Sequence, residues 1–261
     1  MSVQKSWSEL QKMARAARIV IDTLDALEAA AVPGATTGDL DRIARESIEN
    51  AGARPAFLNY RGFPATLCAS VNEEVVHGIP GGRKLREGDI VGLDLGCILD
   101  GFFGDSARTV AVGKIGEEAE QLMKTTREAL LAGVEMCRPD KRVGDIGHAV
   151  QAHAEARGYS VVREFVGHGI GTSLHEEPQV PNYGPPGRRE RLVPGMCLAI
   201  EPMDNAGGPE VEVLADGWTA VTKDRRLSAH FEFAVAVTEY GPWILSEPYP
   251  YAALEAEAAN A

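Results

Sequence analysis

Apolar side chains recur at helical spacing in four separate stretches of the chain. In the first stretch, one face is formed by Leu10, Met13, Ala17, Leu24 and Leu27. Such spacing predicts amphipathic helices, and the glycines and prolines beyond each stretch predict where the helix ends. The predicted helices span residues 7–31, 37–51, 117–136 and 143–157. They form two pairs, so we expect each half of the chain to begin with two helices.

Shorter apolar runs follow each helix pair and are typical of β-strands. Two Asp-Gly pairs, Asp100-Gly101 and Asp216-Gly217, interrupt these runs and favour tight hairpin turns. The two predicted hairpins join residues 90–98 to 102–112 and residues 211–214 to 218–222. Helices packed outside an antiparallel sheet give an α+β fold class.

The chain contains two diverged copies of one pattern. Pro33, Gly38-Asp39-Leu40 and Gly52 recur 106 positions later as Pro139, Gly144-Asp145-Ile146 and Gly158. Further along, residues 88–94 align with residues 195–201, and each segment is a glycine, a mostly apolar run and a final acid. We therefore predict a single domain over residues 1–261, built from two pseudo-symmetric halves at about 7–113 and 114–248.

Composition narrows the possible partners and location. The net charge of −12 argues against a DNA-binding protein, which needs a basic face to neutralise phosphates. The four cysteines form no C-x-x-C pair, so neither a zinc knuckle nor a redox motif is predicted. The chain has no apolar stretch of membrane-spanning length and no signal peptide at its start. We expect a cytoplasmic protein with no membrane partner.

Acids stand at corresponding places in the two halves. Asp94 and Glu201 end the duplicated strands, and a second acid follows in each half, Asp105 and Glu232. A two-residue turn at 100–101 makes Asp94 and Asp105 diagonal neighbours on one face. If the halves pack together, four carboxylates meet, and buried anions need nearby positive charge. One such acid alone would favour an ion pair with Arg or Lys, whereas four in a duplicated arrangement favour a metal site.

Charge and ligand type indicate which metal could bind. Two divalent ions would balance four carboxylates, and oxygen ligands with one imidazole suit Mn²⁺, Fe²⁺, Co²⁺ or Zn²⁺. His168 lies between two glycines, which let the backbone approach an ion or a substrate closely. His77 and His175 lie in other short motifs, and His230 receives no assignment.

These motifs resemble those of the type I methionine aminopeptidase family, which has the creatinase-like "pita-bread" fold. The resemblance runs from about Trp7 to Pro248. It rests on residues 72–80, Asp94, Asp105, residues 167–171, residues 175–178, residues 200–203 and Glu232.

The resemblance implies a single catalytic domain that uses two divalent metal ions to remove the initiator methionine from nascent polypeptide N-termini, preferring a small second residue. The implied metal ligands are Asp94, Asp105, His168, Glu201 and Glu232. His77 and His175 would contact the substrate at the scissile peptide, and Glu201 would also transfer a proton. The implied methionine pocket is lined by Tyr60, Phe63, Cys68 and Trp218.

The sequence departs from the family pattern at two positions. Leu174 stands where an aromatic residue is common beside the pocket, and Phe233 follows Glu232 where a histidine is often found. The departure at Leu174 affects the expected shape of the pocket, and no effect is assigned to Phe233.

Two alternatives remain. An Xaa-Pro peptidase of the same fold is disfavoured by the apolar pocket residues, and a non-catalytic ribosome-binding relative is disfavoured because no ligand is lost. The basic run Arg188-Arg189-Glu190-Arg191 lies on a proline-rich stretch, 178–194, that is predicted to be a loop. Two interpretations of this run are a contact with ribosomal RNA and a solvated loop on a monomeric protein, and the solvated loop is favoured.

Overall fold

The computed structural model describes residues 4–253, and its helices fall where the sequence predicts them. They are α1 (Trp7–Ala30), α2 (Thr37–Asn50), α3 (Glu117–Val134) and α4 (Val143–Glu155). Each begins at the predicted residue and ends one or two residues early. No helix within residues 4–253 combines the length and apolarity that a membrane span requires.

The duplicated residues occupy equivalent structural positions in the two halves. Asp39 and Asp145 each accept a hydrogen bond from the backbone N–H three residues earlier, at 3.0 and 2.7 Å, and so begin α2 and α4. Gly88 and Gly195 have φ angles of 94° and 89°, which only glycine adopts without strain. The repeat therefore encodes the helix starts and the turns that lead into the acid-bearing strands.

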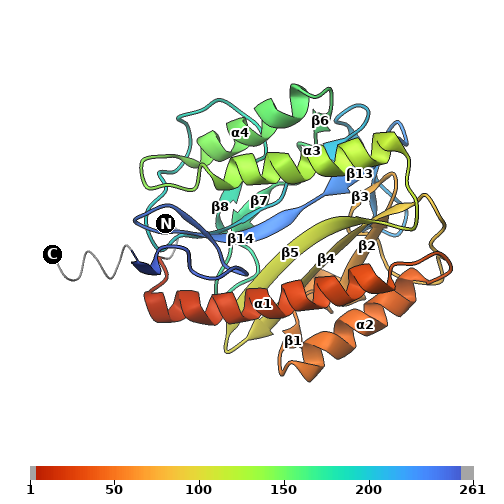
Figure 1. The fold of residues 1–261 in the computed structure, drawn as a ribbon, viewed down its shortest axis with the longest axis horizontal. Coiled ribbons are helices and arrows are strands. Elements are labelled where there is room, and N and C mark those ends of the chain that lie inside the picture. Colours follow the sequence, from red (N-terminus) through yellow and green to blue (C-terminus); the bar gives the residue numbers. More distant parts are fainter. Residues whose placement is uncertain (1–3, 254–261) are drawn as a thin grey trace.

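One antiparallel sheet runs through both halves in the order β1-β4-β5-β14-β9-β7-β8, with β2 on β4 and β15 on β14 (Figure 1). Its strands are β1 (Arg54–Pro55), β2 (Leu67–Val71), β4 (Ile90–Leu99), β5 (Phe102–Ala111), β7 (Gly167–Gly169), β8 (Glu176–Val180), β9 (Cys197–Ile200), β14 (Glu232–Val237) and β15 (Pro242–Ile244). The pairing of β5 with β14 joins the first half to the second.

Two smaller antiparallel sheets lie beside the large one. The first has the order β13 (Ser228–His230), β10 (Met203–Asn205), β6 (Ser160–Val161), and the second has the order β11 (Val211–Val213), β12 (Ala220–Thr222), β3 (Glu74–Val76). A short 3-10 helix, η1 (Tyr60–Gly62), precedes β2.

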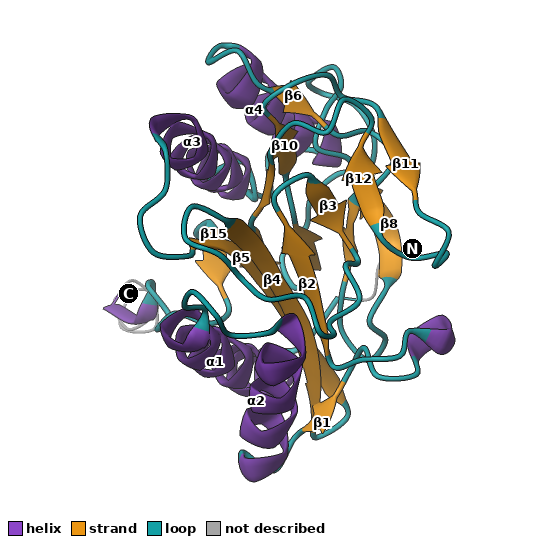
Figure 2. Cartoon of the chain, turned by 90° about the vertical axis from the view of Figure 1, so that its right-hand side faces the viewer, coloured by secondary structure: helices purple, strands orange, loops and turns teal. Residues whose placement is uncertain are grey.

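The helix pairs cover one face of the large sheet. Helices α1 and α2 pack against β2, β4 and β5, and α3 packs against β9 and β14. Figure 2 shows α1, α2 and α3 on the same side of the strands. Buried leucines fill the space between the layers in each half, among them Leu24, Leu40 and Leu93 in the first and Leu130 and Leu198 in the second. This is the predicted α+β arrangement, and it leaves the opposite face of the sheet for other side chains.

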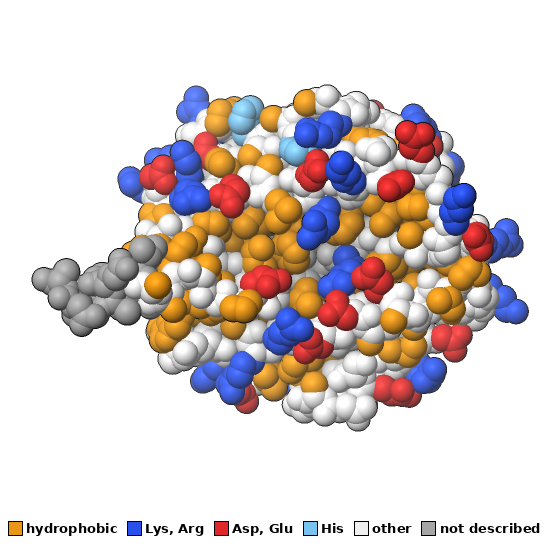
Figure 3. All heavy atoms as spheres, viewed as in Figure 1, with side chains coloured by type: hydrophobic (Ala, Val, Ile, Leu, Met, Phe, Trp, Pro, Cys, Tyr) orange, Lys and Arg blue, Asp and Glu red, His pale blue; other side chains and the backbone are white. Residues whose placement is uncertain are grey.

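Phe233, one of the two departures from the family pattern, belongs to the helix-covered face. It borders a groove between α1 and α3 together with Ile21, Met123 and Phe231. Figure 3 shows that apolar side chains gather across the middle of this view of the molecule. Since side chains alternate along a strand, Phe233 points away from the face that carries Glu232. An apolar residue at this position therefore contributes to packing and lies outside the cavity.

The first predicted hairpin is confirmed. Leu99 pairs with Phe102, and Gly96 pairs with Asp105. The two turn residues have φ angles of 50° and 82°, as in a type I′ turn.

The second predicted hairpin is wrong in its turn. Val213 pairs with Ala220, so six residues, 214–219, connect the strands instead of the predicted three, 215–217. The Asp216 carboxylate accepts hydrogen bonds from the backbone N–H groups of Trp218 and Thr219, at 2.8 and 2.9 Å. This side-chain capping widens the turn and leaves Trp218 outside the strand.

The predicted loop over residues 178–194 is also partly wrong, because β8 continues through Pro178 to Val180. A proline is tolerated there since β8 is the last strand of the sheet, where a missing N–H breaks no ladder bond.

Candidate metal centre and active-site cavity

The pairing of β4, β5 and β14 brings three acids to one face of the sheet. Asp94 lies opposite Ala107, and Ala107 lies opposite Glu232. Asp105 lies two residues before Ala107 and shares its face, because side chains alternate along a strand. These carboxylates come from both halves and meet where β5 pairs with β14.

The next strands add the fourth acid and a histidine. His168 on β7 lies opposite Ala199 on β9, and Ala199 lies opposite Ala234, two residues past Glu232. Glu201 directly follows β9 and is two residues past Ala199. Strand alternation therefore brings His168 and Glu201 to the face that carries the other acids.

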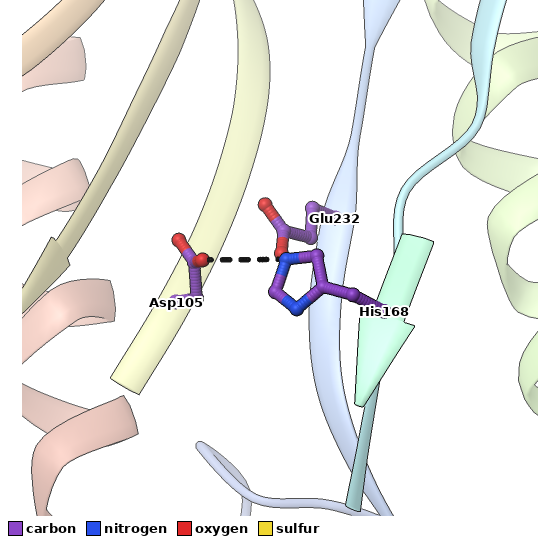
Figure 4. A group of neighbouring side chains, drawn as sticks. All are labelled: Asp105, His168 and Glu232. Atoms are coloured by element: carbon purple, nitrogen blue, oxygen red, sulfur yellow. Dashed lines mark ion pairs between the residues drawn. The ribbon is translucent and has the colours of Figure 1, made fainter. Parts of the chain in front are cut away.

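The side chains converge closely. Asp105, His168 and Glu232 each offer one ligand atom, and these atoms lie within 4.8 Å of one another. Figure 4 shows the three residues extending from three strands toward a common point. The Nε2 atom of His168 lies 3.5 Å from Glu201 Oε1 and 3.9 Å from Asp105 Oδ2. Asp94 is not part of the 4.8 Å group, but it lines the same cavity.

The acids lack the partners that buried acids normally have. One oxygen in each of Asp94, Asp105 and Glu232 is buried without a hydrogen bond. Among residues 4–253, neither lysine nor arginine forms an ion pair with any of the four carboxylates. Unpaired buried oxygens are costly, so this donor set fits a divalent cation and not the alternative of an Arg or Lys ion pair.

Burial shifts the protonation of all four acids in the same direction. It raises the pKa of Asp94 to about 7 and raises the pKa of Asp105, Glu201 and Glu232 well above the usual range. Repulsion from Asp94 raises the pKa of the other three further. Four ionised carboxylates are therefore stable together only beside positive charge.

His168 is held in the form that binds metals. Its Nδ1 lies 2.9 Å from the carbonyl oxygen of Gly169, which places the ring proton on Nδ1 and leaves the Nε2 lone pair facing the acids. Burial, and then repulsion from His175, lowers the pKa of His168 to about 4. The imidazole is thus neutral at physiological pH.

His77 and His175 lie at the side of the acid cluster. The His175 ring centroid is 4.2 Å from that of His168, and its Nδ1 lies 2.8 Å from the Tyr60 hydroxyl. His77 packs edge-on against Trp218, at 6.3 Å between centroids. Burial, and then repulsion from His175, lowers the pKa of His77 to about 4.

Every site residue predicted from the sequence lines one cavity of about 190 Å³. The acids and His168 form one end, and an apolar cluster forms the other. The apolar end contains the predicted residues Tyr60, Phe63, Cys68 and Trp218. Leu174, in place of a common aromatic residue, is buried in this cluster.

Sequence reasoning missed three residues near the site. Phe57 and Arg61 line the cavity, and no motif singled them out. His230 is 3% exposed, its Nε2 has no hydrogen bond, and that atom lies 4.0 Å from Glu201 Oε2. The one sequence signal for His230 was its position two residues before Glu232, which predicts a shared face only if the strand is continuous.

Comparison with known proteins places this geometry in a family. Residues 11–239 match the family described as Metallopeptidase family M24. Methionine aminopeptidase of Clostridium perfringens is 50% identical over 246 residues, which cover 94% of this chain and 99% of the relative. Methionine aminopeptidase 1 of Bacillus subtilis is 49% identical over 246 residues, with the same coverage.

Solved structures give the same result. Methionine aminopeptidase from Thermotoga maritima superposes with a TM-score of 0.93 at 43% identity and covers 95% of this chain and 100% of its own. Prolidase from Pyrococcus furiosus, at 21% identity, covers 95% of this chain and 66% of its own with a TM-score of 0.76. The second similarity concerns the fold alone, and the two together support the predicted pita-bread architecture.

Proposed function

This chain belongs to metallopeptidase family M24, and we propose that it is a divalent-metal-dependent aminopeptidase. It removes methionine from the N-termini of nascent proteins and peptides and prefers a small second residue. The observation that carries the proposal is the cluster of four carboxylates without counter-cations, next to an apolar pocket. Relatives about 50% identical over nearly the full chain are named methionine aminopeptidase.

The proposed cofactor is a pair of divalent ions drawn from Mn²⁺, Fe²⁺, Co²⁺ and Zn²⁺. Their ligands would be Asp94, Asp105, His168, Glu201 and Glu232. Two ions balance the charge of the four carboxylates, and oxygen with imidazole is a ligand set for these metals. When bound, such ions lower the pKa of a water molecule and polarise the scissile carbonyl.

The protein's own groups would orient the substrate and move protons. With the Tyr60 hydroxyl donating to Nδ1 of His175 at 2.8 Å, the proton of neutral His175 is on Nε2, where it can donate to the developing oxyanion. His77 would hydrogen-bond the substrate backbone from the Trp218 side. Glu201 would carry a proton to the leaving amine.

The apolar end of the cavity would bind the methionine side chain. Phe63 and Trp218 meet edge to face, with 5.2 Å between ring centroids, and Cys68 is buried beside them. Aromatic walls suit an unbranched thioether because sulfur makes favourable contacts with rings. The shape and low polarity of this pocket favour methionine over the side chains that precede proline in Xaa-Pro substrates. A comparison of Met-Ala-Ser with an Ala-Pro peptide tests this preference.

The remaining proposals concern partners and location. We propose nascent polypeptide N-termini as the substrates of a monomeric, cytoplasmic enzyme. Arg188, Arg189 and Arg191 are exposed, and the backbone of their loop caps α4 by accepting the N–H of Val143 and Gly144. This capping gives the loop a structural role, and we interpret its arginines as solvated and not as a ribosome contact.

The decisive experiment compares peptides and metals. Chelated protein should not release methionine from Met-Ala-Ser, and Mn²⁺ or Co²⁺ titrated separately in anaerobic buffer should restore release. Full turnover by the metal-stripped protein would rule out the mechanism. Faster cleavage of an Ala-Pro peptide than of Met-Ala-Ser would favour the Xaa-Pro peptidase, and folded protein inactive with every ion would favour a non-catalytic relative.

A further inference from the structure

A buried ion pair connects the segment before α1 to the loop that carries His175. The Nζ atom of Lys5 lies 2.6 Å from Glu176 Oε2. The Lys5 side chain is 2% exposed and that of Glu176 is 15% exposed. A lysine seldom lies this deep without a specific role, because its charge must be taken out of water.

The Glu176 carboxylate organises the loop between β7 and β8. Its Oε1 atom accepts hydrogen bonds from the backbone N–H of Thr172 at 2.8 Å and of Ser173 at 3.2 Å. Glu176 pairs with Gly169 across the two strands and directly follows His175. One carboxylate therefore fixes both ends of the loop on which His175 is placed.

Lys5 is itself held in place by close backbone contacts. Its N–H donates to the Gly195 carbonyl at 2.7 Å, which ties the segment to the start of β9. Its side chain crosses Gly171 so closely that a Cβ there would lie 2.2 Å from Lys5 Cε. A side chain at position 171 would therefore displace the Lys5 ammonium or the Glu176 carboxylate from the ion pair.

The other side of the loop faces the cavity. His175 contacts the Tyr60 hydroxyl and the ring of His168 there. We propose that the Lys5–Glu176 ion pair is a positioning device for His175: the ammonium orients the carboxylate, the carboxylate fixes the loop, and the loop aims the imidazole. This inference rests on the proposed function in assigning His175 to the scissile peptide.

Removing the ammonium should affect the chemical step more than substrate binding. Lys5→Met keeps most of the side-chain volume but leaves the Glu176 carboxylate unpaired, which allows the loop to relax. At the apolar end of the cavity, Leu174 lies on this loop, but Phe63, Cys68 and Trp218 do not. Most of the methionine pocket is therefore independent of the loop, so KM should stay within about twofold while kcat falls roughly tenfold.

The test is a double-mutant cycle with His175. Lys5→Met is measured on Met-Ala-Ser in the wild-type background and in a His175→Ala background, where it should lower kcat by no more than about twofold. Hydrogen–deuterium exchange of residues 171–176 should be faster in Lys5→Met. The matched control is Lys124→Met, which removes a lysine with a 64% exposed side chain on α3 and should change neither kcat nor this exchange.

The outcomes separate this inference from the proposed function. An equal loss of kcat in both backgrounds, an unchanged kcat in Lys5→Met, or unchanged exchange of the loop amides would overturn the positioning role. Absence of methionine release by the wild type would instead overturn the proposed function, and the exchange data would still show whether Lys5 holds the loop. If Lys5→Met folds poorly, the same cycle is made with Lys5→Met combined with Glu176→Gln, which leaves no unpaired charge.

Discussion

Small residues between the acids give the candidate metal centre its room. Ala107 separates Asp94 from Glu232 across the strands, and Gly96 lies opposite Asp105. A Cβ on Gly96 would already lie 3.0 Å from the Phe57 ring and from the Gly104 carbonyl. A larger side chain at position 96 would therefore collide with Phe57 and with the backbone of β5 beside Asp105. A larger side chain at position 107 would lie between Asp94 and Glu232.

His175→Ala should separate catalysis from metal binding. In the proposed mechanism His175 donates a hydrogen bond to the oxyanion and binds no metal, so its loss should leave the ligand set complete. We expect kcat to fall by about 10²–10³-fold while bound metal, measured by mass spectrometry of the purified protein, stays near the wild-type amount. Asp105→Asn is the comparison that should lose metal. Loss of metal from His175→Ala would mean that its role is misassigned.

At the scale of elements, the fold depends on one very close contact between α1 and β5. A Cβ on Gly104 would lie 2.6 Å from the backbone carbon of Ala16 and 2.7 Å from the nitrogen of Ala17. Because backbone atoms of a packed helix cannot move aside, a side chain at position 104 must push α1 from the sheet. This contact also supports Asp105, the next residue on β5.

Gly104→Ala should therefore lower the free energy of unfolding by about 1–3 kcal/mol, measured by urea denaturation. Gly82→Ala is the control, since an added Cβ there meets no atom within 4 Å and its φ is not left-handed. Equal stability of the two variants would show that α1 can shift without cost.

Local chemistry explains which elements were predictable. The turn at Asp100-Gly101 needs only residues adjacent in sequence, and its register is as predicted. The turn at Asp216-Gly217 has the same dipeptide, yet the Asp216 side chain binds two backbone N–H groups and lengthens the connection. An Asp-Gly dipeptide therefore does not show whether the aspartate will form a two-residue turn or will bind backbone N–H groups in a longer connection.

At the scale of the whole molecule, joining the halves gathers four acids and the histidines that adjoin them. The raised pKa of Asp94, about 7, and of the other three acids means that the folded, metal-free protein holds protons that the unfolded chain releases. The protons bound by the folded state therefore contribute to the free energy of unfolding at low pH. This contribution is lost as the pH rises through the pKa values of the folded state. His77 and His168, whose pKa is lowered to about 4, act oppositely, but only below about pH 6.5.

The metal-free protein should thus lose thermal stability as pH is raised from about 6.5 to 8. Saturating Mn²⁺ or Co²⁺ should remove most of this loss, because bound cations favour the ionised carboxylates. Buried Asp204, with its pKa raised to about 7, contributes a share that metal does not reverse. The measurement is Tm by differential scanning calorimetry with and without chelator. A Tm that rises with pH in the chelated protein would contradict the claim that the four buried carboxylates repel one another when they ionise.

The sequence alone determined the helices, the first hairpin, the duplicated caps and turns, and the residue types of the site. Helix periodicity, capping and tight turns involve residues a few positions apart, so these features can be predicted from the sequence. The tertiary structure decided which side chains meet: the β5–β14 pairing that joins Asp105 to Glu232, the approach of His230 to Glu201, and the Lys5–Glu176 pair across 171 positions. Those contacts depend on how distant strands pair and pack, which no local pattern specifies.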